Sequence, residues 1–263
     1  MGTRGRIGKA VQEAVSSANA RAAWGNFPPV NILAELGDLR KHPRYGEAKG
    51  GNVNAAYQII KSIEDRAGGK WIDSIRAMLG DSRPVLVPVH AREQSDLPLG
   101  NAIPGTLAVI LGQALGLRVD TRVVQISIVK RTGADGWTRL ALPPGFAGKL
   151  DTPSLGALMV DDTLTQGGTL ANQRGWLEAQ GTHVIGAVTL TGKQYFATLR
   201  IQTSTLKDLR GLYATIEDWW IALRGYGFDR FTESEARYLI KSGKTADEVR
   251  NIIIARRQEA GLR

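Results

Sequence analysis

Hydrophobic positions along the chain change their spacing twice. Up to residue 83 they recur at intervals of three and four, which is the spacing of one helix face. From residue 84 to about residue 206, short apolar runs alternate with single helical patterns, and after residue 207 the helical spacing returns. The pattern predicts a helical N-terminal extension over 1–83, an α/β domain over 84–206 and a helical C-terminal extension over 207–263.

The middle segment carries the predicted strands. Most of its apolar runs have no polar face, and helical patterns separate them. Strands of this kind form mostly parallel sheets with helices on both faces. We therefore expect an α/β fold around such a sheet. The predicted strands span 85–90, 122–130, 157–161 and 183–190, and the predicted helices span 105–115 and 168–180.

The flanking segments contain their own helix signals. An Ala-rich helix is expected over 10–21, ended by a Pro-Pro pair, and two more are expected over 52–67 and 71–79. In the C-terminal segment, two Thr-x-x-Glu sequences have the spacing of capping boxes, in which threonine and glutamate each satisfy a free N–H group of the first turn. They predict helices over 233–241 and 246–260.

Two long loops are expected at the same edge of the sheet. Residues 91–104 follow the first predicted strand, and residues 131–153 follow the second. Loops of this length in a compact domain commonly serve as lids or binding loops. Ligands of parallel sheets bind beyond the carboxyl ends of the strands, so this edge is where chemistry is expected.

Composition narrows the classes of protein. The chain of 263 residues has a net charge of +9 and no cysteine, which excludes disulfides, thiol nucleophiles, iron–sulfur clusters and Cys-based zinc sites. The longest apolar stretch, 107–117, is shorter than the roughly 20 residues of a membrane span. The N-terminus lacks the apolar core of a signal peptide. We therefore expect a cytoplasmic protein without membrane contact.

One segment, at the end of the third predicted strand, carries candidate chemistry. The strand ends in Asp161 and Asp162, and a Gly-rich turn with hydroxyl side chains then opens a helix. Carboxylates at a strand end can accept hydrogen bonds from vicinal hydroxyls or bind a hard cation. The N–H groups of a glycine-rich helix start suit a phosphate. Together they predict a ribose 5-phosphate site, whose phosphate would lie at Thr165, Gln166, Gly167, Gly168 and Thr169.

These residues resemble the signature of type I phosphoribosyltransferases, which bind phosphoribosyl pyrophosphate (PRPP). VDDTLTQGGT matches the family's acidic pair and Thr-Gly-x-Thr turn at Asp161, Asp162, Gly167 and Thr169. It differs at Gln166, where the family has a small residue. VLVPVH and LAVILGQALGL are similar to the first strand and the following helix of competence-associated ComF-type members. The resemblance covers residues 84 to about 206.

The resemblance implies transfer of the phosphoribosyl group from PRPP to a base-like acceptor, with Mg²⁺ as cofactor and release of pyrophosphate. It assigns Asp161 and Asp162 to the ribose hydroxyls, directly or through Mg²⁺, and residues 165–169 to the 5′-phosphate. Arg131, at the base of a flexible lid over 131–153, joins the two aspartates as a catalytic residue.

Two further sets of contacts follow from the same resemblance. The pyrophosphate loop would contain His90, Ala91 and Arg92, directly after the first strand. Lys193 and Tyr195, after the last strand, would contact the acceptor base. Each set also has a structural interpretation, which the sequence leaves open: a hydrogen-bonded histidine, a solvated arginine, and packing at a rim.

The flanks suggest a second function class. Most of the excess positive charge lies outside the middle segment, and the segment LRKHPRYGEAKGGNVNAAYQIIKSI resembles the opening of orphan bacterial transferase-like proteins, some from toxin–antitoxin loci beside RecQ-type helicases. The alternative is a catalytically weak or inactive nucleotide-binding regulator, with flanks that contact DNA or a helicase-like protein. Gln166, longer than the family's small residue, leaves this alternative open. The sequence also leaves open whether the chain forms a homodimer.

Overall fold

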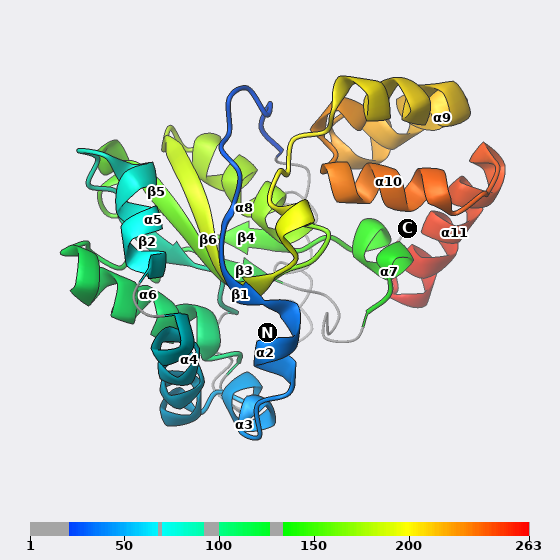
Figure 1. Ribbon diagram of the computed structural model, residues 1–263. Helices are drawn as coiled ribbons and strands as arrows, with labels where there is room; N and C mark the ends of the chain where they lie inside the picture. Colours follow the sequence, from blue (N-terminus) through cyan, green and yellow to red (C-terminus); the bar gives the residue numbers. More distant parts are fainter. Residues whose placement is uncertain (1–20, 68–69, 92–99, 127–133, 263) are drawn as a thin grey trace, which may run out of the picture.

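A four-stranded parallel sheet forms the centre of the protein (Figure 1). The computed structural model describes residues 21–67, 70–91, 100–126 and 134–262. The strand order is β1-β6-β5-β2, with every neighbouring pair parallel. The expected α/β class is confirmed. The strands are β1 (Asn31–Glu35), β2 (Val85–Pro88), β5 (Ala157–Leu164) and β6 (Val184–Gly192).

Both faces of the sheet are covered, because alternate strand residues are apolar in both directions. Leu86 and Leu158 point into one core, which they share with α4, α5 and α6. Val87 and Met159 point into the other core, which they share with α8 and the C-terminal helices. The bounds are α4 (Val53–Ala67), α5 (Lys70–Leu79), α6 (Ile103–Leu115) and α8 (Gly168–Glu178), each close to its predicted range.

Strand β1 shows that the prediction of an N-terminal extension made only of helices is wrong. Its residues pair in parallel with β6, with Asn31 opposite Val188, so part of the 1–83 segment completes the main sheet. β1 has only five residues and a mixed burial pattern, too short for a clear alternation in the sequence. Helices α2 (Leu36–Arg40) and α3 (Tyr45–Lys49) follow it, and residues 10–20 of an expected helix lie outside the described residues.

The described part of the predicted strand over 122–130 does not belong to the parallel sheet. Its described part, β3 (Val124–Ile126), pairs antiparallel with β4 (Gly145–Ala147) in a separate two-stranded sheet. β4 comes from the 131–153 segment, expected to be an irregular lid. The same segment forms helix α7 (Gly136–Ala141), because the Asp135 side chain accepts the Thr138 N–H at 2.7 Å and caps it.

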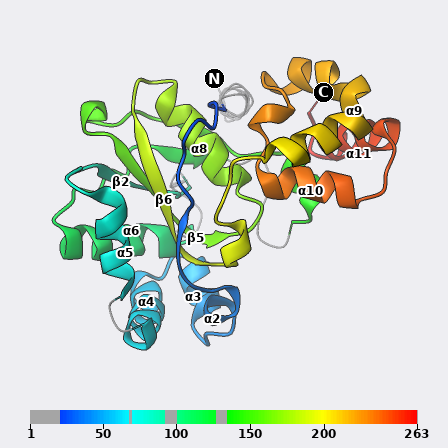
Figure 2. The ribbon, with the colours of Figure 1, turned by 45° about the horizontal axis from the view of Figure 1, so that its top comes forward.

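Three helices after the sheet form the C-terminal helical module: α9 (Thr203–Arg224), α10 (Glu233–Lys241) and α11 (Ala246–Glu259). The module lies at the side of the sheet, with α7 against α10 and α11 (Figures 1 and 2). Both predicted capping boxes are confirmed. No helix in the described ranges has the length and apolarity of a membrane span. Short 3-10 helices lie at Pro153–Leu155, Gln194–Phe196 and Phe228–Arg230.

The two capping threonines provide a matched pair of variants. Thr245→Ala should lower the free energy of unfolding by about 1 kcal/mol, the usual cost of losing an N-cap side chain. Thr232→Ala should cost about 2–3 kcal/mol, because the buried Thr232 hydroxyl also donates to the Gln166 carbonyl oxygen at 2.5 Å. Urea unfolding measures both, and equal losses would contradict a role for Thr232 in joining α10 to the 165–169 loop.

Candidate anion-binding pocket

The loop between β5 and α8 contains the residues that are predicted to bind phosphate. Gly167 adopts a left-handed conformation, with φ of +77°, and α8 begins at Gly168. A Cβ on Gly167 would lie 2.4 Å from Leu199 Cδ2, and its positive φ also favours glycine; a Cβ on Gly168 would lie 2.4 Å from Glu235 Oε1 and would displace that carboxylate. The loop therefore brings the N-terminus of α8, with its positive dipole end, to the carboxyl end of β5.

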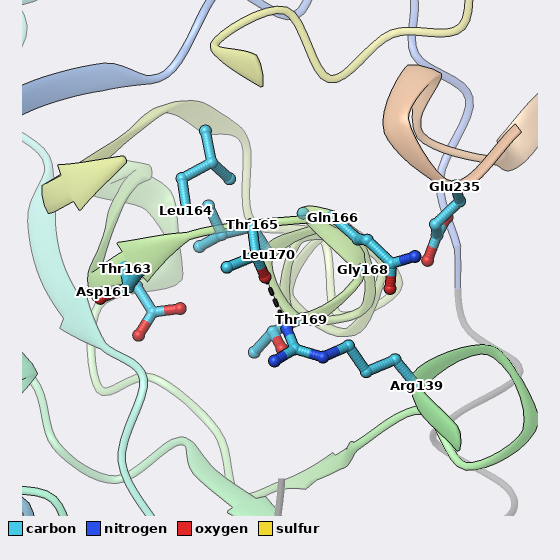
Figure 3. Close-up of a pocket in the computed structure, with 11 residues that line it drawn as sticks. Arg139, Asp161, Thr163, Leu164, Thr165, Gln166, Gly168, Thr169, Leu170 and Glu235 are labelled. Atoms are coloured by element: carbon cyan, nitrogen blue, oxygen red, sulfur yellow. Dashed lines mark hydrogen bonds between the residues drawn. The ribbon is translucent and has the colours of Figure 1, made fainter. Parts of the chain in front are cut away.

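A pocket lies over this loop (Figure 3). The structure brings together Asp161 and all five predicted phosphate-loop residues. Side chains from α7 and α10 contribute to its walls, and the pocket has a volume of about 20 Å³, which admits about one water molecule. The lining residues are Arg139, Asp161, Thr163, Leu164, Thr165, Gln166, Gly167, Gly168, Thr169, Leu170 and Glu235.

Arg139 supplies a positive charge that the sequence did not point to. From α7, its Nη1 donates to Thr165 Oγ1 at 2.5 Å (Figure 3). Its Nε donates to the Ala134 carbonyl oxygen at 3.0 Å. Among the residues that the structure describes, no carboxylate forms an ion pair with it. Burial lowers the pKa of Arg139, and the nearby Arg40 lowers it further. A half-buried cation in this state favours an anion in the pocket.

A local signal could have identified Arg139. The sequence from Asp135 to Ala141 has an N-cap aspartate followed by six residues that form a helical turn, and Arg139 is the cation within them. The resemblance instead implies a flexible lid over 131–153 with Arg131 as its catalytic cation. Arg131 lies outside the described residues.

Gln166 lines the pocket, and its side-chain carbonyl oxygen lacks a hydrogen-bond donor among the described residues. Its Oε1 is buried and accepts no hydrogen bond from the described residues. Leaving a buried carbonyl oxygen unpaired costs about 1–3 kcal/mol. Turning the Gln166 side chain outward would relieve this cost, enlarge the pocket and let the amide donate to an anion.

The two aspartates lie within β5, which continues to Leu164, instead of at the strand end as expected. Their side chains interact with each other but have different further neighbours. Asp161 lines the pocket. Asp162 Oδ2 accepts hydrogen bonds from Lys49 Nζ at 2.6 Å and from Asn101 Nδ2 at 2.8 Å. Of the two carboxylates, the structure therefore places only Asp161 in the lining of the pocket.

The electrostatics of the two aspartates differ accordingly. Burial raises the pKa of Asp161 well above its usual range, and the neighbouring charge of Asp162 adds to the increase. Burial lowers the pKa of Lys49, but the attraction of Asp162 outweighs this effect, and the pKa is raised overall. Asp162 and Lys49 form an ion pair at 2.6 Å, whereas a cation or hydroxyl donors in the pocket would stabilise the ionised form of Asp161.

Asp161 is the residue that fits a Mg²⁺ ion at this site. One of its oxygens accepts the Asp162 N–H at 2.8 Å, and its desolvated carboxylate lacks a paired cation among the described residues. Asp162 fits less well as a second ligand, because its Oδ2 atom already accepts hydrogen bonds from Lys49 and Asn101 and it does not line the pocket. No cluster of three or more His, Cys, Asp or Glu side chains occurs within the described ranges. An ion here would therefore depend on oxygens of the bound ligand and water.

The other predicted site residues lie away from the pocket or outside the described residues. His90 Nε2 lies 2.8 Å from the Thr121 carbonyl oxygen, the structural interpretation that the sequence left open. Ala91 pairs with Gln125 in a single parallel bridge, and Arg92 lies outside the described residues. Lys193 and Tyr195 are exposed and contact each other, with Lys193 Nζ 5.5 Å from the Tyr195 ring.

No family model matches the sequence. The chain is similar to "Protein TraN" of Escherichia coli, with 36% identity over 241 residues, which are 91% of this chain and 52% of that protein. An uncharacterized protein of Haemophilus influenzae is 38% identical over 159 residues, 60% of this chain and 34% of that protein. The chain thus spans about half the length of the first relative and about a third of the second. A match of 241 residues includes parts of both helical flanks.

The opposite environments of the two aspartates predict opposite effects on stability. Asp161→Asn should raise the free energy of unfolding at pH 7, because a group with a raised pKa in the folded state destabilises the fold once it ionises. In the native protein, the free energy of unfolding should fall as the pH rises from about 4 through the folded pKa of Asp161. The variant should lack this part of the pH dependence.

Asp162→Asn should instead lower the free energy of unfolding by about 1–3 kcal/mol, because Lys49 loses its charged partner. Thermal unfolding of both variants between pH 4 and pH 8 measures the difference. Destabilisation by Asp161→Asn at pH 7 would contradict the assigned electrostatics.

Proposed function

We propose that the chain binds PRPP, with its 5′-phosphate at the 165–169 loop, and transfers the phosphoribosyl group to a base-like acceptor. The fold proposed for residues 84–206 is that of type I phosphoribosyltransferases, extended by β1. The parallel sheet and the loop between β5 and α8 support this proposal. The convergence of Arg139 with the N-terminus of α8 is the single observation that carries it.

Three groups around the pocket suit different parts of the ligand. The loop N–H groups and the hydroxyls of Thr165 and Thr169 would donate to the phosphate. Arg139 would neutralise its charge, because it already donates to Thr165 and has no paired carboxylate in the described part of the chain. Asp161, on the β5 side of the same pocket, would accept hydrogen bonds from the ribose hydroxyls.

The proposed reaction is a displacement at C1′ of PRPP. A nitrogen of the acceptor forms a bond to C1′ while the bond from C1′ to the pyrophosphate oxygen breaks, and that oxygen keeps the electron pair. The acceptor nitrogen then loses its proton to water. Mg²⁺ bound with PRPP would neutralise the leaving pyrophosphate. The Asp161 carboxylate would stabilise the positive charge that develops on the ribose ring.

Binding can be tested with a charge-matched pair of variants. Arg139→Ala should weaken PRPP binding, measured by isothermal titration calorimetry with Mg²⁺, by at least about tenfold, because a charge-assisted hydrogen bond is lost. Arg83→Ala removes the same charge from an exposed residue just before β2, at the opposite edge of the sheet, and should leave the affinity unchanged. Equal affinities of the wild type and Arg139→Ala would refute this binding site.

A second candidate function is a nucleotide-binding regulator without turnover. The ion pair of Asp162 with Lys49 favours it, because only one carboxylate of the pair then meets the ligand. Incubation with PRPP, Mg²⁺ and a panel of purine and pyrimidine bases distinguishes the two. Release of pyrophosphate that Asp161→Asn abolishes supports the transferase, whereas tight PRPP binding without release supports the regulator.

The proposed DNA or helicase-like partner of the flanks has limited support from the last helix. Arg257 is buried, and Arg256 pairs with Asp135 at 3.3 Å and with Glu259 at 3.1 Å. Arg250 stacks on Trp219 at 5.7 Å. These arginines are largely engaged within the protein, so a partner surface would lie elsewhere on the flanks.

A further inference from the structure

Helix α7, which carries Arg139, depends on its neighbours. It has six residues, and helices this short are not stable alone in water. Its position therefore depends on its contacts with other elements, and these come chiefly from the C-terminal helical module (Figure 1).

Tyr238 of α10 holds the start of α7. A Cβ on Gly136 would lie 2.4 Å from Tyr238 Cζ, so the ring packs directly on the helix backbone. The rings of Tyr238 and Trp137 also meet edge to face, with centroids 5.3 Å apart. Arg256 of α11 adds an ion pair with Asp135, the N-cap of α7. The module thereby fixes the first turn of α7, one turn before Arg139.

Arg224 of α9 holds the end of the same helix. Its Nη2 donates to the Leu140 carbonyl oxygen at 2.9 Å and to the Ala141 carbonyl oxygen. These carbonyls have no partner within the helix, because they belong to its last turn. Arg224 is 3% exposed, and burial lowers its pKa to about 10. The buried guanidinium of Arg224 therefore joins the C-terminal end of α7 to α9.

The module also contacts the opposite wall of the pocket. Thr232, the N-cap of α10, donates to the Gln166 carbonyl oxygen, and the Glu235 carboxylate lies against Gly168. Glu235 is held in place by two hydrogen bonds from Arg21, at 2.7 and 2.8 Å. The first turn of α10 and the 165–169 loop are thus one packed unit.

We propose that the C-terminal helical module sets the phosphate affinity of the pocket by positioning Arg139, with Tyr238 and Arg224 as the positioning residues. The inference rests on the proposed function and adds a mode of regulation to it. Neither residue lines the pocket, so each acts through α7. Coupling of this kind is reciprocal: a ligand phosphate would strengthen the docking of the module, and a partner that shifts the module would weaken phosphate binding.

Calorimetric titration of the full chain with ribose 5-phosphate tests the coupling. Tyr238→Ala should weaken binding by about tenfold, like the loss of a charged hydrogen bond at the site itself. In an Arg139→Ala background the same substitution should have no further effect, which a general loss of stability would not produce. Gly136→Ala should also weaken binding, because its Cβ would clash with the Tyr238 ring, and in a Tyr238→Ala background it should have no further effect.

Tyr213→Phe is the matched control. It removes hydrogen bonds of 3.0 Å to the carbonyl oxygens of Leu239 and Lys244, both within the module, and should leave the affinity unchanged. If Arg139→Ala weakens binding but Tyr238→Ala does not, the coupling is wrong and the proposed site stands. If the wild type does not bind ribose 5-phosphate at all, both are wrong.

Discussion

The half-buried charge of Arg139 is the constraint around which the pocket is organised. Burying a guanidinium is costly unless a carboxylate or another anion compensates it. In the described structure Arg139 meets hydroxyl and carbonyl oxygens instead, with the positive end of α8 before it and Arg40 nearby. Burial and the charge of Arg40 both disfavour the charged form of Arg139, and a bound phosphate would stabilise it.

The charge on the other side of the pocket comes from a single strand, β5. Its two neighbouring carboxylates interact with each other, but Asp161 lines the pocket and Asp162 does not. Asp162 serves the structure by joining α3 and the start of α6 through Lys49 and Asn101. Burial, together with the neighbouring charge of Asp162, raises the pKa of Asp161, and perturbed pKa values of this kind are common at functional sites.

The 165–169 loop could be predicted from the sequence because its conformation depends on neighbouring residues in the chain. The 165–169 loop follows a buried strand and opens a helix, and its glycines have local conformational reasons, so five neighbouring residues were identified together. Arg139 could not be placed in the same way, because its approach to Thr165 depends on the contacts of α7 with α9, α10 and α11. Strand β1 was missed for a similar reason: pairing with β6 defines it, and its own pattern does not.

The most direct test of an anion site at the start of α8 is a titration of ¹⁵N-labelled protein with ribose 5-phosphate, followed by amide chemical shifts. The structure predicts that the largest shifts belong to the backbone N–H groups of Gly167, Gly168 and Thr169, accompanied by the Nε–H of Arg139. Shifts confined to another part of the surface, such as the hollow lined by Trp24 and Phe27, would contradict the account.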